Sequence, residues 1–572
     1  MYQAGWSKAE IKVTPKGYAM HGFGMWQHRA WGQESALLAR TIVLSDGAAP
    51  LIFCCMDLGY ITQAMRAGIV ERLSNQLPNF DEERLVLTCT HTHSGPGGCT
   101  QDALYNIVTP GYVPAHVAAV VLAACSSIKQ ALARLAPVEL SLSRGTFDEQ
   151  VEVAWNRSLA AYNLNPDVTP RTETETHLAL NREMQLLSLR RDGKTQALLS
   201  LFGVHATCCG NTLDKYSADN KGKAASQAEA QLAKAGADQP VAIFAQATAG
   251  DVSPYYHGPG DKKRRAAIKG DAHYAYADAN AKKQVACAFS LDTQAGTPLT
   301  GQLDGILTYV DFTDIKADPA FANGDDKAYT SEPCHGVAFF VGTPVDGPGM
   351  PGFLGAGAKR MARRLKQKRL AQLATLPVDE RAYYERIYTA QGAKDILMES
   401  GKKKVLGHAL DKLPLPGFFD PLVKEMKRQA SIGAIDKSNM VPTVLPLQIL
   451  RIGSLALVCC PGEFTTTAGK RVMQTVQQQL ANTGIEQVLI STYCNDYMGY
   501  VTTNEEYQQQ NYEGGHTIFG QWTLAAFQTC FAKLAPQLVR PADARDHDRS
   551  TRPAPAPADE LAKRSRLTPP KR

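Results

Sequence analysis

Two histidines one residue apart close an apolar run in the segment RLVLTCTHTHSGPGG. Because strand side chains alternate between faces, the run predicts one face that carries Leu85, Leu87, Cys89, His91 and His93. A lone histidine on an apolar face is usually a hydrogen-bonded core residue. An HxH pair where a strand gives way to a glycine-rich loop is instead a candidate metal site.

Four further apolar runs end in reactive or metal-binding side chains. These are His205 in FGVHAT, Asp251 and Ser253 in IFAQATAGDVSP, Glu463 in LALVCCPGEFTT, and Tyr497 and Tyr500 in LISTYCNDYMGY. In open α/β sheets, sites form outside the carboxyl ends of strands, so the five endings predict one common site. Two histidines and one glutamate are typical of catalytic zinc, because three protein ligands leave a position for water. Tyrosine is an uncommon ligand, and by itself Tyr500 is interpreted as a packed aromatic with a bonded hydroxyl.

The elements that must position these residues alternate short apolar runs with helical patterns. PLIFCCMDLG precedes MRAGIVERLSNQL, and RLVLTCTHTH precedes VPAHVAAVVLAACSSIKQALARL. This alternation predicts an α/β fold, a layered sandwich of central β-sheets flanked by helices, with the metal site at the carboxyl ends of strands. We expect one domain over residues 1–540, with a helical insert at about 347–439, and a disordered basic tail over 541–572, which has almost no large apolar residues.

Composition narrows the class of protein. The chain has 572 residues, 44% of them hydrophobic and 20% charged, as in a soluble globular protein. The net charge is +6, but the segment 541–572 has eight basic and five acidic residues, so half of the excess lies there. The near-neutral remainder argues against nucleic-acid binding. The 13 cysteines include three adjacent pairs in or beside apolar runs, which indicates reduced, buried thiols.

The termini and apolar runs bear on location. MYQAGWSKAEIKVTP lacks a basic segment followed by an apolar stretch, and the longest apolar run, Ala115–Ala124, is too short to cross a membrane. We therefore expect a cytoplasmic protein without a transmembrane segment, with secretion as the alternative. The oligomeric state is left open.

Five segments together resemble the neutral ceramidases. They are THTHSGPGG at 90–98, DNKG at 219–222, GDVSP at 250–254, PGEFTT at 461–466 and EEYQQQNYEGG at 505–515, in the family's order. The resemblance extends from about residue 4 to 536. It implies one zinc ion per chain, held by His91, His205, Glu463 and Tyr500. It also implies that His93 and Arg157 line the reaction centre, that Ser253 is catalytically important, and that Tyr512 contacts the scissile group.

The activity implied is hydrolysis of an N-acyl amide, ceramide or a related lipid, into a fatty acid and an amine. Water activated by zinc would attack the carbonyl, while His93, Arg157 or a tyrosine stabilises the oxyanion and helps to protonate the leaving amine. Ser253 is expected to position substrate, since no GxSxG elbow supports a serine nucleophile. Without the resemblance, Arg157 is interpreted as a solvated or salt-bridged arginine, Ser253 as the start of a turn and Asp251 as a brace.

Two departures from the family keep other functions open. After GDVSP the chain reads YYHGPGDKKRR, so the loop from Tyr255 to Arg265 is rebuilt. After the catalytic segments we expect the disordered tail in place of the immunoglobulin-like domain that is typical of the family. The alternatives are a zinc amidase or peptidase for a soluble amide, and a non-catalytic lipid-binding relative. The basic segment GAKRMARRLKQKRL is interpreted as a solvated face, with contact to an anionic membrane surface as the alternative.

Overall fold

The computed structural model describes residues 2–107, 111–255, 261–343, 345–414 and 420–569. The predicted mixed α/β class is confirmed. The larger sheet has the order β11-β9-β8-β6-β1-β3-β4-β5, with β13 beside β6. Its strands are β1 (Tyr2–Glu10), β3 (Leu38–Ser45), β4 (Leu51–Met56), β5 (Leu85–Cys89), β6 (Ala136–Thr146), β8 (Glu183–Arg191), β9 (Lys194–Leu201), β11 (Val241–Ala245) and β13 (Thr297–Pro298). Among the described residues of this sheet, two strand pairs are parallel, β4–β5 and β9–β11, and the other pairs are antiparallel.

A second sheet of four strands packs against the first. It runs β14 (Leu303–Asp311), β21 (Val444–Ile452), β22 (Leu455–Cys459) and β24 (Gln487–Ser491), and its last two strands are parallel. Side chains of both sheets, among them Trp6, Phe53, Leu199 and Leu457, share one apolar cluster. The next residue along a strand commonly points into a different cluster, as Ile52 does beside Phe53. The strands are therefore buried on both faces, and this explains their nearly continuous apolar runs.

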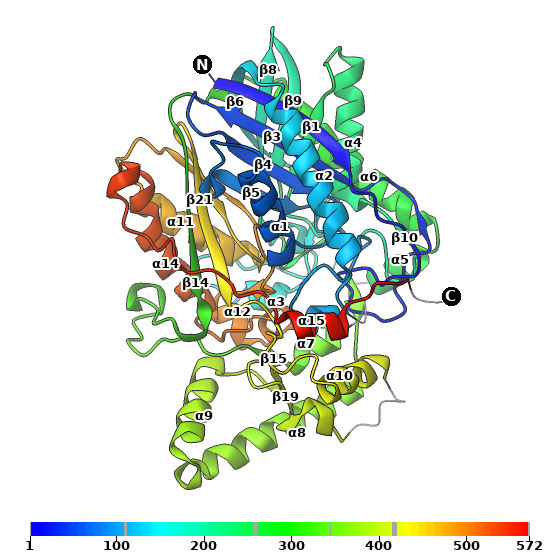
Figure 1. Ribbon diagram of the computed structural model, residues 1–572, viewed down its shortest axis with the longest axis vertical. Helices are drawn as coiled ribbons and strands as arrows, with labels where there is room; N and C mark the ends of the chain where they lie inside the picture. The colour runs from blue at the N-terminus through cyan, green and yellow to red at the C-terminus, as the bar shows by residue number, and fades with distance from the viewer. Residues whose placement is uncertain (1, 108–110, 256–260, 344, 415–419, 570–572) are drawn as a thin grey trace.

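Helices cover the outer faces of the two sheets (Figure 1). Helices α1 (Gln63–Ser74) and α2 (Pro114–Leu132) pack over β1, β3 and β4, whereas α4 (Asp219–Lys234) and α6 (Ala272–Asp292) cover β8, β9 and β11. Helices α11 (Thr466–Gln479) and α14 (Thr523–Leu538) cover the second sheet. Shorter helices connect these elements: α3 (Leu159–Tyr162), α5 (Asp261–Ala267), α7 (Val337–Val341), α12 (Asn504–Gln508) and α13 (Tyr512–Gly515).

Helix α2 contains the apolar run Ala115–Ala124. Among the described residues it is the one helix long and apolar enough to cross a membrane by length and composition. It packs against β1 and β3, and 56% of its most apolar window is buried. Its apolar character is therefore accounted for by its place over the sheet.

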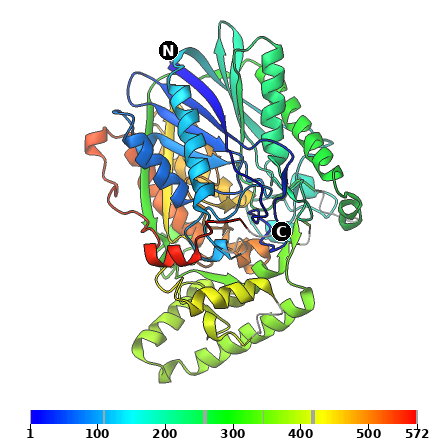
Figure 2. The same ribbon diagram turned by 45° about the vertical axis from the view of Figure 1, so that its right-hand side comes forward.

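The segment predicted as a helical insert forms a lobe at one end of the molecule (Figures 1 and 2). It holds α8 (Gly352–Ala371), α9 (Val378–Gln391) and α10 (Pro421–Ser431). It also holds β18 (Ile396–Glu399), β19 (Lys404–Val405) and β20 (His408–Ala409), which continue a small sheet from β15 (Cys334–Gly336). The lobe is thus joined to the body by strand pairing as well as by chain connectivity.

The tail differs from the expectation of disorder as far as residue 569. It follows the surface of the body and forms α15 (Ala558–Arg564), in which Glu560 and Arg564 are buried. The Glu560 carboxylate accepts hydrogen bonds from the backbone nitrogens of Lys437 and Ser438 at 2.7 and 2.9 Å. Disorder was predicted because the segment has almost no large apolar side chains, but polar contacts hold it to the body of the protein.

Candidate active site

Three short backbone pairings bring the predicted site residues together. In the parallel pair β23 (Glu463–Phe464) and β25 (Tyr500–Val501), Glu463 lies directly beside Tyr500. A single bridge joins Thr92 to Ala206 and so places His91 and His93 next to His205. The antiparallel pair β7 (Trp155–Asn156) and β12 (Val252–Ser253) carries Arg157 toward the same point. All of these segments follow strands of the two sheets or connect them.

The three histidines converge through their Nε2 atoms. The Nε2 atoms of His91 and His93 are 3.1 Å apart, and one ring nitrogen of each of His91, His93 and His205 lies within 4.8 Å of the other two. The Nδ1 atom of His91 contacts the carbonyl oxygen of Gly59 at 2.6 Å, and that of His205 contacts the carbonyl of Val252 at 3.0 Å. Since a carbonyl only accepts, both Nδ1 atoms carry the proton, and both Nε2 lone pairs face the centre.

His91 and His93 were predicted to lie on one face of a strand, but it is a turn of the backbone after the strand that brings them together. Strand β5 ends at Cys89, and His91 adopts φ of 64°, in the left-handed region that non-glycine residues rarely occupy. The backbone therefore turns at His91 and brings the two rings to face each other. Strained backbone of this kind is concentrated at functional sites.

Glu463 faces the histidines with one carboxylate oxygen. Its Oε2 lies 3.0 Å from Nε2 of His205 and 3.4 Å from Nε2 of His91. Its Oε1 accepts a hydrogen bond from the hydroxyl of Tyr497 at 2.5 Å, and the Tyr493 hydroxyl donates to Oε2 at 3.2 Å. Burial opposes ionisation, but when His91 and His205 are protonated, their charge and hydrogen bonds outweigh burial and hold the pKa of Glu463 well below its usual value.

Tyr500 completes the cluster. Its hydroxyl lies 3.2 Å from Nε2 of His205 and accepts a hydrogen bond from Nη2 of Arg157 at 2.9 Å. Burial and the Glu463 carboxylate raise the pKa of this phenol well above its usual value, against the effect of Arg157. A phenolate at this position therefore requires a further positive charge beside it.

The donor atoms fit a metal ion. Ligand atoms 2.0–2.1 Å from a tetrahedral zinc ion are about 3.3 Å from each other. The separations among Nε2 of His91, Nε2 of His205, Oε2 of Glu463 and the Tyr500 hydroxyl that are given above lie between 3.0 and 3.4 Å. His93 is near enough to share in such a cluster, so geometry by itself does not separate a ligand role from a catalytic one for this residue.

Of the two states that the sequence alone allowed for Arg157, solvated or salt-bridged, the structure shows the second, in a buried position. Its side chain is 2% exposed and forms ion pairs with Asp346 at 3.0 Å and Glu513 at 2.9 Å. Burial disfavours the charged guanidinium, but Tyr500, Glu513 and Asp346 outweigh this effect and raise the pKa of Arg157 well above its ordinary value. The guanidinium is therefore a fixed positive charge beside the Tyr500 hydroxyl.

Two residues of the GDVSP segment support this arrangement. The Ser253 hydroxyl donates to Oδ1 of Asp346 at 2.8 Å, and no histidine contacts it within the part of the chain that the structure describes. The Asp251 carboxylate accepts from the backbone nitrogen of Thr466 at 2.8 Å and from Nδ2 of Asn156 at 2.7 Å. Asp251 therefore braces the loop, as its sequence context allowed. Residues 256–260 of the rebuilt loop lie outside the described residues.

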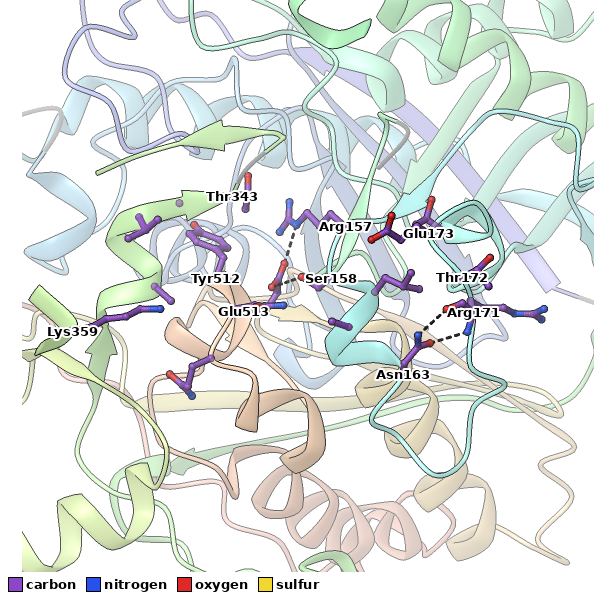
Figure 3. A pocket seen from close by; sticks show the side chains of 18 residues that line it. Arg157, Ser158, Asn163, Arg171, Thr172, Glu173, Thr343, Lys359, Tyr512 and Glu513 are labelled. Carbon is purple, nitrogen blue, oxygen red and sulfur yellow. Dashed lines mark hydrogen bonds and ion pairs between the residues drawn. The ribbon is translucent and has the colours of Figure 1, made fainter. Parts of the chain in front are cut away.

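A cavity of about 810 Å³ opens beside this cluster (Figure 3). Arg157 and Tyr512 line its centre, and the Tyr512 ring meets that of Tyr500 edge to face at 5.3 Å. Arg171 and Glu173 lie to one side of them in this view and Lys359 to the other. The predicted Tyr512 thus connects the buried cluster with an open space that both charged and apolar side chains line.

Sequence reasoning missed three supports of the site. Glu513 directly follows Tyr512 inside the segment EEYQQQNYEGG, so its position could have been found there. Asp346 lies in VGTPVDGPGM and shows no pattern that singles it out. Tyr493 stacks on the His91 ring at 4.2 Å, and nothing in its sequence context distinguished it from a core aromatic.

A buried cluster of imidazole, carboxylate and phenol groups beside an open cavity in a mixed α/β fold defines a candidate enzyme site. The model of the family "Neutral/alkaline non-lysosomal ceramidase, N-terminal" matches residues 2–412 and 424–529. The chain therefore belongs to the neutral/alkaline non-lysosomal ceramidase family.

Individual relatives agree with this family. A neutral ceramidase of Pseudomonas aeruginosa is 31% identical, over 94% of this chain and 72% of the relative. One of Mycobacterium tuberculosis is 30% identical, over 94% and 77%. The crystal structure of the Pseudomonas aeruginosa neutral ceramidase is similar with a TM-score of 0.74 and 29% identity, over 94% of this chain and 74% of that one. A structure titled "Ceramidase complexed with C2" gives 0.76 and 30%, over 97% and 78%.

Proposed function

We propose that this protein hydrolyses the amide bond of ceramide or a related N-acyl lipid, giving a free fatty acid and an amine. We further propose that it uses one zinc ion held by His91, His205, Glu463 and Tyr500. Membership of the ceramidase family supports the reaction. The observation that carries the metal assignment is the convergence of these four side chains, with the Nδ1 atoms of both histidines fixed on backbone carbonyls.

A zinc ion in this position would lower the pKa of a water molecule and polarise the scissile carbonyl. The protein's own part is to hold the ligand atoms in place. Tyr497 and Tyr493 orient the Glu463 carboxylate, and the carbonyls of Gly59 and Val252 orient the two imidazoles. The cluster is thereby organised before substrate enters.

Arg157 supplies fixed positive charge for the oxyanion that forms when the amide carbonyl is attacked. It is a candidate catalytic residue because its guanidinium reaches both the cluster and the cavity. Glu513 and Asp346 position it, and Ser253 acts on it indirectly by holding Asp346. Ser253 is therefore proposed as a positioning residue and not as a nucleophile.

His93 and Tyr512 have the remaining roles. Nδ1 of His93 has no hydrogen-bond partner among the described residues, while its Nε2 faces His91. His93 is thus placed to pass a proton to the leaving amine. Tyr512 lies between the cavity and Tyr500 and is proposed to contact the scissile group.

A second candidate, a zinc amidase or peptidase for a soluble amide, is favoured by one observation. The cavity is lined by Arg171, Glu173 and Lys359 as well as by apolar Ala338 and Val341, so one of its walls suits a short or polar group. A non-catalytic lipid-binding relative would have no use for the full ligand set. The lipid reaction remains the proposal because the family supports it.

The test is a series of N-acyl amides of increasing acyl length, assayed on protein of known zinc content. Each buried methylene contributes about 0.8 kcal/mol, or about fourfold, so kcat/KM should climb with chain length until the cavity is filled. A flat or falling profile would reject the lipid reaction and favour the soluble amide. Zinc-free protein with full activity, or activity unaffected by a chelator, would reject the metal assignment.

A further inference from the structure

Helix α8 carries an exposed apolar edge. Phe353 is 76% exposed, Leu354 50% and Met361 53%, and Val378 at the start of α9 is 70% exposed. The opposite face of α8 is buried through small residues, Ala358 and Ala362, which pack into an apolar cluster with Val337 and Leu397. The helix is therefore anchored on one side, and its apolar edge has no partner among the described residues.

The same exposed side is strongly cationic. Helix α8 contains seven basic residues and no acidic one. Arg363 and Arg369 are neutralised by Asp395 and Glu399. Arg360, Arg364 and Lys368 form no ion pair with any described residue. At 100° per residue, these three cations fall within an arc of about 120° that also contains the apolar edge. We call this side of the helix the α8 face, and it consists of Phe353, Leu354, Arg360, Met361, Arg364 and Lys368.

The helix that carries the α8 face also borders the candidate site, through Lys359 on another side of the helix. Helix α8 packs on α7, and Ala338 and Val341 of α7 line the cavity together with Lys359 of α8. Phe339 of α7 stacks with Tyr512 at 5.8 Å. Figures 1 and 2 place α8 in the lobe at one end of the molecule, away from the two large sheets. A flat partner can thus reach this helix without meeting the body.

We propose that the α8 face docks on an anionic lipid bilayer, with Phe353, Leu354 and Met361 entering the interface and Arg360, Arg364 and Lys368 contacting lipid phosphates. Charge complementarity and the adjacent apolar side chains together favour this partner, because an interfacial helix needs both. A nucleic acid would use the cations but would leave Phe353 exposed to water. Membrane docking is a property separate from the proposed hydrolysis, and it would hold this cavity near a source of lipid.

The experiment measures binding of the full-length protein to vesicles that contain no ceramide. Vesicles of phosphatidylcholine with 30% phosphatidylglycerol are compared with pure phosphatidylcholine by sedimentation, at low and high salt. We expect binding to the anionic vesicles that weakens with salt. The variant R360Q/R364Q/K368Q should bind about a hundredfold more weakly, since each basic residue near such a surface contributes about fivefold.

A matched control removes three exposed lysines from other elements. K194Q/K234Q/K282Q changes β9, α4 and α6 and alters the net charge by the same amount, so its partition coefficient should stay within about twofold of the parent. A second variant, F353S/L354S, keeps every charge and should weaken binding at least tenfold, because it removes two interfacial apolar groups.

Several results would overturn the proposal. These are equal binding to both vesicle types, an unaltered R360Q/R364Q/K368Q variant, or an equal loss in the lysine control. If the protein binds a soluble polyanion such as polyuridylate, and F353S/L354S leaves vesicle binding unchanged, the α8 face is a polyanion site and not a membrane site. Because the vesicles contain no substrate, failure of the proposed hydrolysis cannot mimic any of these outcomes. The rate at which R360Q/R364Q/K368Q and F353S/L354S hydrolyse a dispersed short-chain N-acyl amide should remain within twofold of the rate of the parent protein.

Discussion

Replacing Glu513 by Gln tests whether Arg157 is held as a compensated buried charge. The Glu513 side chain is 4% exposed and accepts hydrogen bonds from Nε of Arg157 at 2.9 Å and from the Ser158 hydroxyl at 2.7 Å. Glutamine keeps the shape and one acceptor oxygen but removes the negative charge. Arg157 would then depend on Asp346, which already faces Arg265 at 3.4 Å.

The magnitude follows from burial. Removing one partner of a buried ion pair costs about 3–5 kcal/mol. Glu513→Gln should fall at the lower end of this range, because glutamine keeps one acceptor oxygen and Asp346 still pairs with Arg157. We expect a loss of about 3 kcal/mol in the free energy of unfolding, or about 150-fold in the equilibrium constant. The control is Glu183→Gln, whose partner Arg144 has a side chain 46% exposed, and which should cost less than about 1 kcal/mol.

The assay is urea unfolding followed by the fluorescence of the five tryptophans, with turnover measured in parallel. In the Glu513→Gln variant, kcat should fall more than KM rises, because Arg157 is proposed to act on the oxyanion rather than on substrate binding. A stability loss no larger than that of Glu183→Gln, with kcat unchanged, would refute both the buried ion pair and the positioning role of Glu513.

Three further predictions concern other parts of the molecule. Glu463→Gln should leave the fold intact but lower zinc retention on dialysis, because a neutral amide is a poorer ligand; normal zinc content by elemental analysis would remove Glu463 from the metal set. Burial lowers the pKa of Lys394 to about 7, so the unfolded state binds more protons above that pH. Lys394 should therefore add up to about 1.4 kcal/mol of stability per pH unit between pH 7 and 10, and Lys394→Met should remove this contribution in urea unfolding, while Lys221, whose pKa burial also lowers to about 7, keeps its own. Deleting residues 541–572 should cost at least about 2 kcal/mol, since the hydrogen bonds of Glu560 are lost; an unchanged melting temperature would show that the tail adds no stability.

Some features of this protein follow from its sequence alone. Apolar runs such as PLIFCCMDLG determine buried strands, because a strand packed on both faces needs an apolar side chain at nearly every position. The polar endings of these runs contain His91, His205, Glu463 and Tyr500, together with His93, Asp251, Ser253 and Tyr497. The roles of these residues came from resemblance, since periodicity cannot distinguish a tyrosine ligand from a packed tyrosine.

Only the tertiary structure decided how these residues meet. Glu463 and Tyr500 are neighbours because two short segments pair in parallel, and His91 faces His93 because the backbone turns at a positive φ. Asp346 reaches Arg157 from a part of the chain 189 residues away, which no local pattern encodes. The tail was misjudged for the same reason. Local composition reports how much apolar surface a segment can bury, whereas Glu560 and Arg564 are held by polar partners that the fold brings to them.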